Sequence, residues 1–363
     1  MGEMSQDSVR NLVLCLDGTR NEPETGTTNV SRIFDVAVKN HRQLVFYHPG
    51  VGVMGARGAV TSLGQKATRV AGLIGGFGVK DNLEEAYRFL VHNYRSGDRI
   101  FVFGFSRGAY TAQALTGMLR TVGLLRSGAE NLIPYAVKLY ATSNTRRATT
   151  EQTNRYFRRR ERFARQFGNP AFPEAFDSSR HQVHFLGVWD TVKSVGWLNW
   201  KAQIEQVRWP FTAKIVNVDA ARQALAIDER RHAYKEYRFD GKTVKDSGGR
   251  YEEMWFAGAH SDIGGTFDDD HDLSDIAFAW MVEEAAQAGL RVDPQKYRRL
   301  LKVRYGAKLP VDRATGKIHT NSAGWWFLGG WHRRHVQPGD QIHPSVFDRI
   351  HATAGTACPY RLP

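Results

Sequence analysis

A serine flanked by two glycines, in the pattern Gly-x-Ser-x-Gly, occupies residues 104–108 of the chain. An apolar run at 100–103 precedes the pattern, and small and apolar side chains recur at helical spacing after it. We therefore predict a strand that turns sharply into a helix, for which Gly104 and Gly108 leave room. Such a turn holds the hydroxyl of Ser106 at the C-terminal end of the strand, as the nucleophile of an acyl-transfer enzyme requires.

A serine hydroxyl becomes an effective nucleophile only when a base, usually a histidine oriented by a carboxylate, removes its proton. Asp190 follows an apolar run at 184–189, and His260 lies in a glycine-flanked loop after a second run at 252–257. The order Ser106, Asp190, His260 matches the order of nucleophile, acid and base in α/β hydrolases. We predict that these three residues form a catalytic triad.

Four further residues are candidates for supporting roles. Asp17 and Asp262 are the alternative supporting acids. The charge that develops on the substrate oxygen needs backbone N–H donors, and Arg107, directly after the serine, is the expected first donor. We expect the second donor to be Gly18 or Thr19. The alternative, that Asp17 and Gly18 only form a turn, stays open.

Strand-like and helical patterns alternate along the chain, which predicts an α/β fold with a mostly parallel central sheet and helices on both faces. The predicted strands are at 11–16, 44–47, 100–103, 184–189, 234–239 and 252–257, and one of the predicted helices is at 219–233. Ligands of such sheets bind at the C-terminal strand ends. The candidate site residues all follow predicted strands.

We expect one α/β-hydrolase-like catalytic domain over residues 1–363. Within it, arginines and aromatic residues interleave at helical spacing, which predicts a helical, Arg-rich insertion at 124–180. This insertion is either a lid or membrane-facing element, or a helix that packs at the periphery. The residues from 291 to 363 form a basic, Trp-containing segment that we expect to pack on the core.

The net charge of +13 allows an anionic membrane surface or an acidic substrate as partner, or simply a solvated basic face. Nucleic acid is disfavoured, because no zinc-finger spacing or RNA-binding signature accompanies the charge. No apolar run is long enough to span a bilayer and the N-terminus lacks an apolar signal region, so we expect synthesis in the cytoplasm. The two cysteines, Cys15 and Cys358, fit a reducing compartment.

Three other interpretations compete with a serine hydrolase. The turn after residue 16 is close to the nucleophile motif of haloacid-dehalogenase phosphatases, but Cys15 stands where those enzymes need an aspartate. The acidic run at 268–272 offers oxygen ligands for a metal ion, although such a run before a helix is more often a solvated cap. A binding module on a hydrolase fold needs no triad, whereas this chain has all three residues. We expect neither a cofactor nor a catalytic metal.

Several short segments make the chain resemble the DUF2235 family, which includes the Tle1-like phospholipase effectors of type VI secretion. These segments are LDGT at 16–19, TNV at 28–30, YHPGVG at 47–52, GFSRGA at 104–109, WDTV at 189–192, FAGAHSDIGG at 256–265 and IHPSV at 342–346.

The resemblance implies an α/β-hydrolase core and a Ser–Asp–His triad, which falls on Ser106, Asp190 and His260. It implies ester hydrolysis on lipids by a serine esterase or lipase, of the phospholipase A type in some members. It further implies export by type VI secretion and an immunity protein as partner. A soluble carboxylesterase of small esters is the alternative.

Overall fold

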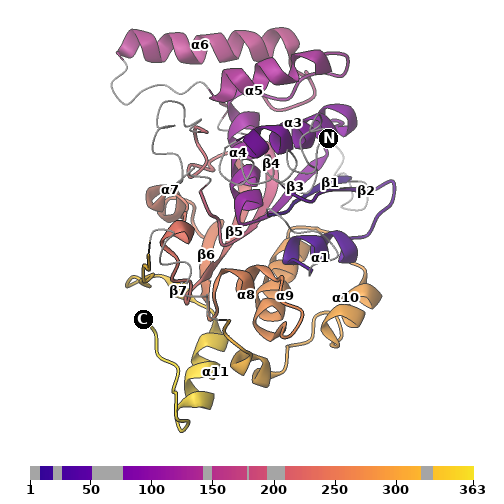
Figure 1. Cartoon of the computed structure of the whole chain (residues 1–363). Helices are drawn as coiled ribbons and strands as arrows, with labels where there is room; N and C mark the ends of the chain where they lie inside the picture. Colours follow the sequence, from indigo (N-terminus) through magenta and orange to yellow (C-terminus); the bar gives the residue numbers. More distant parts are fainter. Residues whose placement is uncertain are drawn as a thin grey trace, which may run out of the picture.

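The computed structural model describes residues 9–18, 27–50, 77–141, 149–177, 180–193, 209–319 and 330–363. Within these residues, seven strands form one sheet in the order β2-β1-β3-β4-β5-β6-β7, and every neighbouring pair is parallel. The predicted α/β class with a parallel central sheet is therefore confirmed (Figure 1).

The elements follow the chain with these bounds. The strands are β1 (Asn11–Leu16), β2 (Gln43–His48), β3 (Arg99–Phe105), β4 (Val183–Trp189), β5 (Val218–Ala226), β6 (Tyr251–Phe256) and β7 (Gln341–Ile342). The α-helices are α1 (Asn29–Val36), α3 (Phe77–Asn93), α4 (Arg107–Val122), α5 (Ile133–Ala141), α6 (Thr150–Phe167), α7 (Gly241–Lys245), α8 (His260–Gly264), α9 (Asp272–Gln287), α10 (Pro294–Leu301) and α11 (Pro344–Thr353). None of the described helices combines the length and the apolar character needed to cross a membrane.

The strands alternate between two hydrophobic cores. In β1, Leu12, Leu14 and Leu16 contribute to one core and Val13 and Cys15 to the other, because successive side chains of a strand point to opposite faces. The first core also contains side chains of α3, α4 and α5, and the second those of α1, α9 and α10. Figure 1 shows these two sets of helices on opposite sides of the sheet.

The parallel arrangement brings the candidate site residues to one edge of the sheet. Asp17 follows β1, Ser106 follows β3 and Asp190 follows β4, while His260 begins α8 shortly after β6. Since the C-terminal ends of parallel strands meet at the same edge, residues far apart in the chain become neighbours there.

Two sequence predictions between residues 219 and 239 are wrong. The helix predicted at 219–233 is mostly the strand β5, and the strand predicted at 234–239 contains only an isolated bridge, from Glu236 to Val192. β5 is rich in alanine, a composition that favours a helix. Its pairing with β4 on one side and β6 on the other overrides that preference.

Residues after 291 extend the sheet at its far edge. β7 pairs with β6, with Gln341 opposite Met254 and Ile342 opposite Trp255. Val346 of α11 packs with Trp255 in a third, smaller core. The C-terminal segment thus lies against the strand that leads to His260.

Helices α5 and α6 lie within the stretch predicted as a helical insertion. At the end of α6, Arg126 N donates to Phe167 O at 3.0 Å, and Asn169 N donates to Leu124 O at 2.7 Å. These contacts lie at the C-terminal end of α4, whereas Ser106 precedes the first residue of that helix. Since α4 has 16 residues, it is about 24 Å long, and these contacts lie at the end of α4 that is far from Ser106. A lid over Ser106 stays a prediction.

Gly187 in β4 allows a tight contact between the sheet and α9. A Cβ at this position would lie 2.7 Å from Met281 Sδ and 2.8 Å from Phe103 Cδ1. We expect Gly187→Ala to lower the free energy of unfolding by about 1–3 kcal/mol, because the extra methyl overpacks the core. Gly355→Ala, where the new Cβ has no neighbour within 4 Å, should change it by less than about 0.5 kcal/mol. Urea unfolding measures both, and equal values for the two variants would contradict this packing.

Candidate active site

The turn between β3 and α4 presents Ser106 on a strained backbone. Its φ of 57° and ψ of −122° lie outside the conformations that residues other than glycine normally adopt. A Cβ on Gly104 would lie 2.7 Å from Ala109 Cα, and one on Gly108 would lie 2.1 Å from Leu16 O. Both glycines are therefore needed for the close approach of helix and strands, as the sequence pattern predicts.

Asp190 lies beside this turn because β4 pairs with β3. Ser106 N donates to Trp189 O at 3.1 Å, and Val192 N donates to Ser106 O at 3.3 Å. Asp190 also has a positive φ, of 40°, and its N donates to Ala224 O at 2.8 Å. The residue has no exposed surface.

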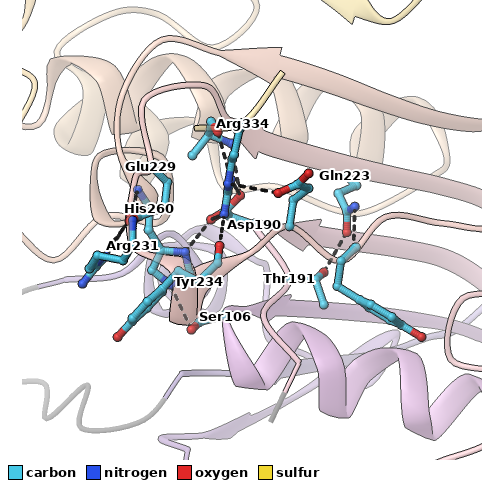
Figure 2. A network of polar contacts seen from close by, with 12 residues as sticks. Ser106, Asp190, Thr191, Gln223, Glu229, Arg231, Tyr234, His260 and Arg334 are labelled. Atoms are coloured by element: carbon cyan, nitrogen blue, oxygen red, sulfur yellow. Dashed lines mark hydrogen bonds and ion pairs between the residues drawn. The ribbon is translucent and has the colours of Figure 1, made fainter. Parts of the chain in front are cut away.

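His260, the first residue of α8, connects the serine to the aspartate (Figure 2). Its Nδ1 lies 2.5 Å from Asp190 Oδ2 and its Nε2 lies 2.9 Å from Ser106 Oγ. An ionised carboxylate only accepts hydrogen bonds, so Nδ1 carries the proton and donates to Asp190. In the neutral imidazole Nε2 is then an acceptor, and the Ser106 hydroxyl donates to it. This line of groups can pass a proton from Ser106 Oγ to His260 Nε2.

Two aromatic rings and a second carboxylate hold His260 in place. The rings of Phe105 and Tyr234 lie 4.6 and 4.8 Å from the imidazole, measured between centroids. The backbone N of His260 donates to Glu229 Oε2 at 3.2 Å. Arg231 pairs with the same carboxylate, with Nη2 at 2.7 Å from Oε2. Both the main chain and the ring of His260 are therefore positioned.

Arg334 also binds the Asp190 carboxylate. Its Nη1 lies 2.5 Å from Oδ1 and its Nη2 lies 3.1 Å from Oδ2. The same guanidinium donates to Ala226 O at 2.9 Å and to Tyr234 O at 2.5 Å. Figure 2 shows Arg334 and His260 approaching Asp190 from different elements.

Burial and charge pairing set the protonation of Asp190 and His260. Burial alone would raise the pKa of Asp190, but the Arg334 guanidinium and the hydrogen bond with His260 outweigh it and hold that pKa well below the usual range. Burial lowers the pKa of His260 below that of free imidazole, although the hydrogen bond with Asp190 acts in the opposite direction. At neutral pH Asp190 is therefore ionised and His260 is neutral, the state in which Nε2 accepts a proton.

Asp17 organises the turn after β1. Its Oδ1 accepts from Gly18 N at 2.7 Å, and its Oδ2 accepts from Thr28 Oγ1 at 2.5 Å and from the Tyr47 hydroxyl at 2.9 Å. The N–H of Gly18 is thus engaged by a carboxylate, which argues against its predicted use for a substrate oxygen. Thr19 lies outside the described residues.

Asp262, the other alternative acid, binds a different histidine. Its Oδ1 lies 2.6 Å from His319 Nδ1, and its Oδ2 accepts from Ala259 N at 2.8 Å. Asp262 therefore orders the loop before His260, while Asp190 is the carboxylate hydrogen-bonded to the His260 ring.

The acidic run at 268–272 is bound by groups of the chain itself. Asp269 pairs with Lys317 Nζ at 2.7 Å and with His319 Nε2 at 3.0 Å. Asp270 accepts from Asp272 N at 2.9 Å and from Lys317 N at 2.8 Å. Nowhere in the described ranges do three or more His, Cys, Asp or Glu side chains gather in a way that could hold a metal ion.

Sequence reasoning missed Arg334, Glu229 and Tyr234. Glu229 comes shortly after β5, so a correct assignment of that strand would have marked it as an acid at a strand end, like Asp190. Arg334 stands between Arg333 and His335, both exposed. No motif or spacing separates it from its solvated neighbours, and the sequence therefore carries no signal for it.

Comparison with known proteins shows a family and several relatives. The family model described as "T6SS, Phospholipase effector Tle1-like, catalytic domain" matches residues 10–284. The uncharacterized protein YEL023C of Saccharomyces cerevisiae is 29% identical over 246 residues, which cover 64% of this chain and 33% of that protein.

Two solved structures are similar at 17% identity and a TM-score of 0.40 each. The first is an uncharacterized protein from Pseudomonas aeruginosa, and the match covers 80% of this chain and 47% of that one. The second is the Tle1 effector bound to the VgrG spike of the type 6 secretion system, and the match covers 71% of this chain and 51% of that one. The chain thus spans 33% of the yeast relative and about half of each solved chain.

The family model covers most of the chain and includes the strands that carry Ser106, Asp190 and His260. The chain therefore belongs to the family of Tle1-like phospholipase effector catalytic domains of type VI secretion.

Proposed function

We propose that this chain is a serine hydrolase that cleaves acyl esters, and that its substrates are phospholipids. The observation that carries the proposal is the continuous line of hydrogen bonds from Ser106 Oγ through His260 to Asp190, at 2.9 and 2.5 Å. Membership of a phospholipase family supports the substrate class, and the family's place in type VI secretion supports export by that route with an immunity protein as partner.

In the first half-reaction, His260 Nε2 takes the Ser106 proton while Oγ attacks the acyl carbonyl carbon. Asp190 stabilises the imidazolium that forms. His260 then protonates the leaving alcohol as its C–O bond breaks, and the acyl group stays on Oγ. In the second half-reaction, His260 deprotonates a water that attacks this acyl-enzyme, which releases the carboxylic acid and restores Ser106.

The oxyanion of each tetrahedral intermediate needs hydrogen-bond donors. Arg107 is the first residue of α4 and directly follows Ser106, the position whose backbone N–H serves the oxyanion in hydrolases with a strand–turn–helix nucleophile. We assign its N–H as one donor. Of the two predicted second donors, Gly18 is engaged by Asp17, so Thr19 is the remaining candidate.

The α5–α6 face supports an anionic lipid surface as partner. A hollow of about 710 Å³ lies between these helices, with Arg155, Arg158, Arg159 and Arg162 beside the rings of Tyr135, Phe163 and Phe167. Arg155 pairs with Glu151. Arg158 and Arg162 are exposed and have no acidic partner among the residues described, which leaves their charge available to phosphate groups.

Ser106→Ala should abolish labelling by a fluorophosphonate probe and slow ester hydrolysis by at least about a thousandfold, because the nucleophile is lost. Ser127→Ala, at an exposed serine, is the matched control and should behave like the wild type. Mass spectrometry of the intact protein measures labelling. Release of fatty acid from phosphatidylglycerol and phosphatidylcholine vesicles measures hydrolysis.

The same assays decide between the candidate functions. Equal labelling of the wild type and Ser106→Ala would refute Ser106 as the nucleophile, and no labelling of either would leave a binding module. Cleavage of short-chain soluble esters, with no cleavage of vesicles at any anionic lipid content, would identify a carboxylesterase instead of a phospholipase.

Hydrolysis should fall at low pH as His260 becomes protonated, because an imidazolium cannot accept the serine proton. Burial lowers the pKa of His260, so activity should persist to a lower pH than for a free imidazole. The midpoint of the acid limb of kcat/KM for a soluble ester should lie below about 6.5. A midpoint above that value, with the fold intact by circular dichroism, would contradict this description of the site.

Reversing two charges on α6 should weaken binding to anionic vesicles. We expect the double variant Arg158→Glu/Arg162→Glu to bind phosphatidylglycerol vesicles at least about tenfold more weakly, since each basic residue near such a surface contributes about 1 kcal/mol. Arg304→Glu/Lys308→Glu makes the same change in charge just after α10, on the other side of the sheet (Figure 1), and should bind like the wild type. Equal co-sedimentation of the two double variants would rule out a specific role for α6.

A further inference from the structure

Arg334 lies outside residues 10–284, the part that the family model matches, yet its guanidinium lies within the candidate site. It comes from the segment between α10 and β7. Its side chain is 1% exposed, so it differs from the solvated basic residues on either side of it. The proposed acyl transfer through Ser106, His260 and Asp190 makes no direct use of it.

The guanidinium binds both oxygens of one carboxylate. Nη1 lies 2.5 Å from Asp190 Oδ1 and Nη2 lies 3.1 Å from Oδ2, and a fork of this kind fixes the plane of the carboxylate. Ala226 N donates to Oδ1 at 3.1 Å. With the plane fixed in this way, Oδ2 faces His260 Nδ1 at 2.5 Å.

The positive charge of Arg334 also stabilises the buried Asp190 carboxylate. A carboxylate removed from water is costly unless a cation pairs with it. His260 is neutral before proton transfer, so it does not supply that cation in the resting site. Arg334 supplies it, and an ionised Asp190 is what stabilises the imidazolium once the proton has moved.

We propose that Arg334 is a positioning residue for ester hydrolysis, which keeps Asp190 ionised and oriented so that His260 holds its proton on Nδ1 and remains a base at Nε2. The inference rests on the proposed function and deepens it. It also means that the segment after residue 330 completes a site whose other members lie in the family-matched region.

Other charged groups face these residues from neighbouring elements. Glu236 Oε2 lies 3.7 Å from Arg334 Nε. Glu229, after β5, accepts a hydrogen bond from His260 N and pairs with Arg231. Removal of Arg334 leaves the same carboxylates with one cation fewer, so protonation near His260 becomes easier.

Arg334→Met removes the charge and keeps an unbranched side chain. The pKa of Asp190 should rise, and the pKa of His260 should rise while Asp190 is still ionised. Both changes move the acid limb of Ser106 labelling by a fluorophosphonate to higher pH, by about one pH unit. Labelling at neutral pH should slow by at least about tenfold. The second-order labelling rate, measured as a function of pH on the full chain, gives both numbers.

Two arginine variants serve as comparisons. Arg334→Lys keeps the charge and loses the fork, so it should label more slowly than the wild type with an unchanged acid midpoint. Arg238 pairs with Glu253 at 2.8 Å and Asp340 at 2.6 Å, away from Asp190. Arg238→Met controls for the loss of an arginine pair in this part of the fold and should keep the wild-type rate and midpoint.

A purely structural role would lower the Tm of Arg334→Met without moving its acid midpoint, and that result would overturn the inference.

If circular dichroism shows that Arg334→Met does not fold, the labelling of Arg334→Lys tests the inference instead. A slower rate with the wild-type midpoint then supports the inference, and the wild-type rate overturns it. If the wild type itself is not labelled at Ser106, the proposed function fails and this inference fails with it. If the wild type is labelled and the Arg334 variants keep its labelling rate and acid midpoint, the inference fails while the proposed function stands.

Discussion

The candidate site depends on keeping one negative charge away from water. Asp190 has no exposed surface, and the penalty for burying such an ion is on the order of several kcal/mol. Its carboxylate is stabilised by Arg334, by His260 and by the backbone N of Ala226. These groups come from the C-terminal segment, from α8 and from the end of β5, so burial of this charge ties together parts of the fold that are distant in sequence.

The backbone is strained where these parts meet. Ser106 and Asp190 both have positive φ, at 57° and 40°, and each such conformation costs about 1–3 kcal/mol for a residue other than glycine. Pairing of β3 with β4 holds them, because Ser106 N donates to Trp189 O and Val192 N donates to Ser106 O. Backbone hydrogen bonds just beyond the ends of β3 and β4 thus maintain two unfavourable conformations side by side.

The part of the site that could be predicted from sequence is the part with a local signal. The turn at Ser106 was predictable because its glycines, its preceding strand and its following helix are adjacent in the chain. Strand β5 was not, because its alanine-rich composition favours a helix and only the two flanking strands override it. Glu229 was missed with it. Arg334 had no local signal at all, since its role comes from a contact with a residue 144 positions away.

That separation of 144 residues has a consequence during synthesis. A ribosome adds about 5–20 residues per second, so Asp190 enters the growing chain roughly 7–30 seconds before Arg334 does. Through that interval the carboxylate has no arginine to pair with, whatever strands have already formed around it. The complete site therefore exists only in chains that have been translated at least as far as residue 334.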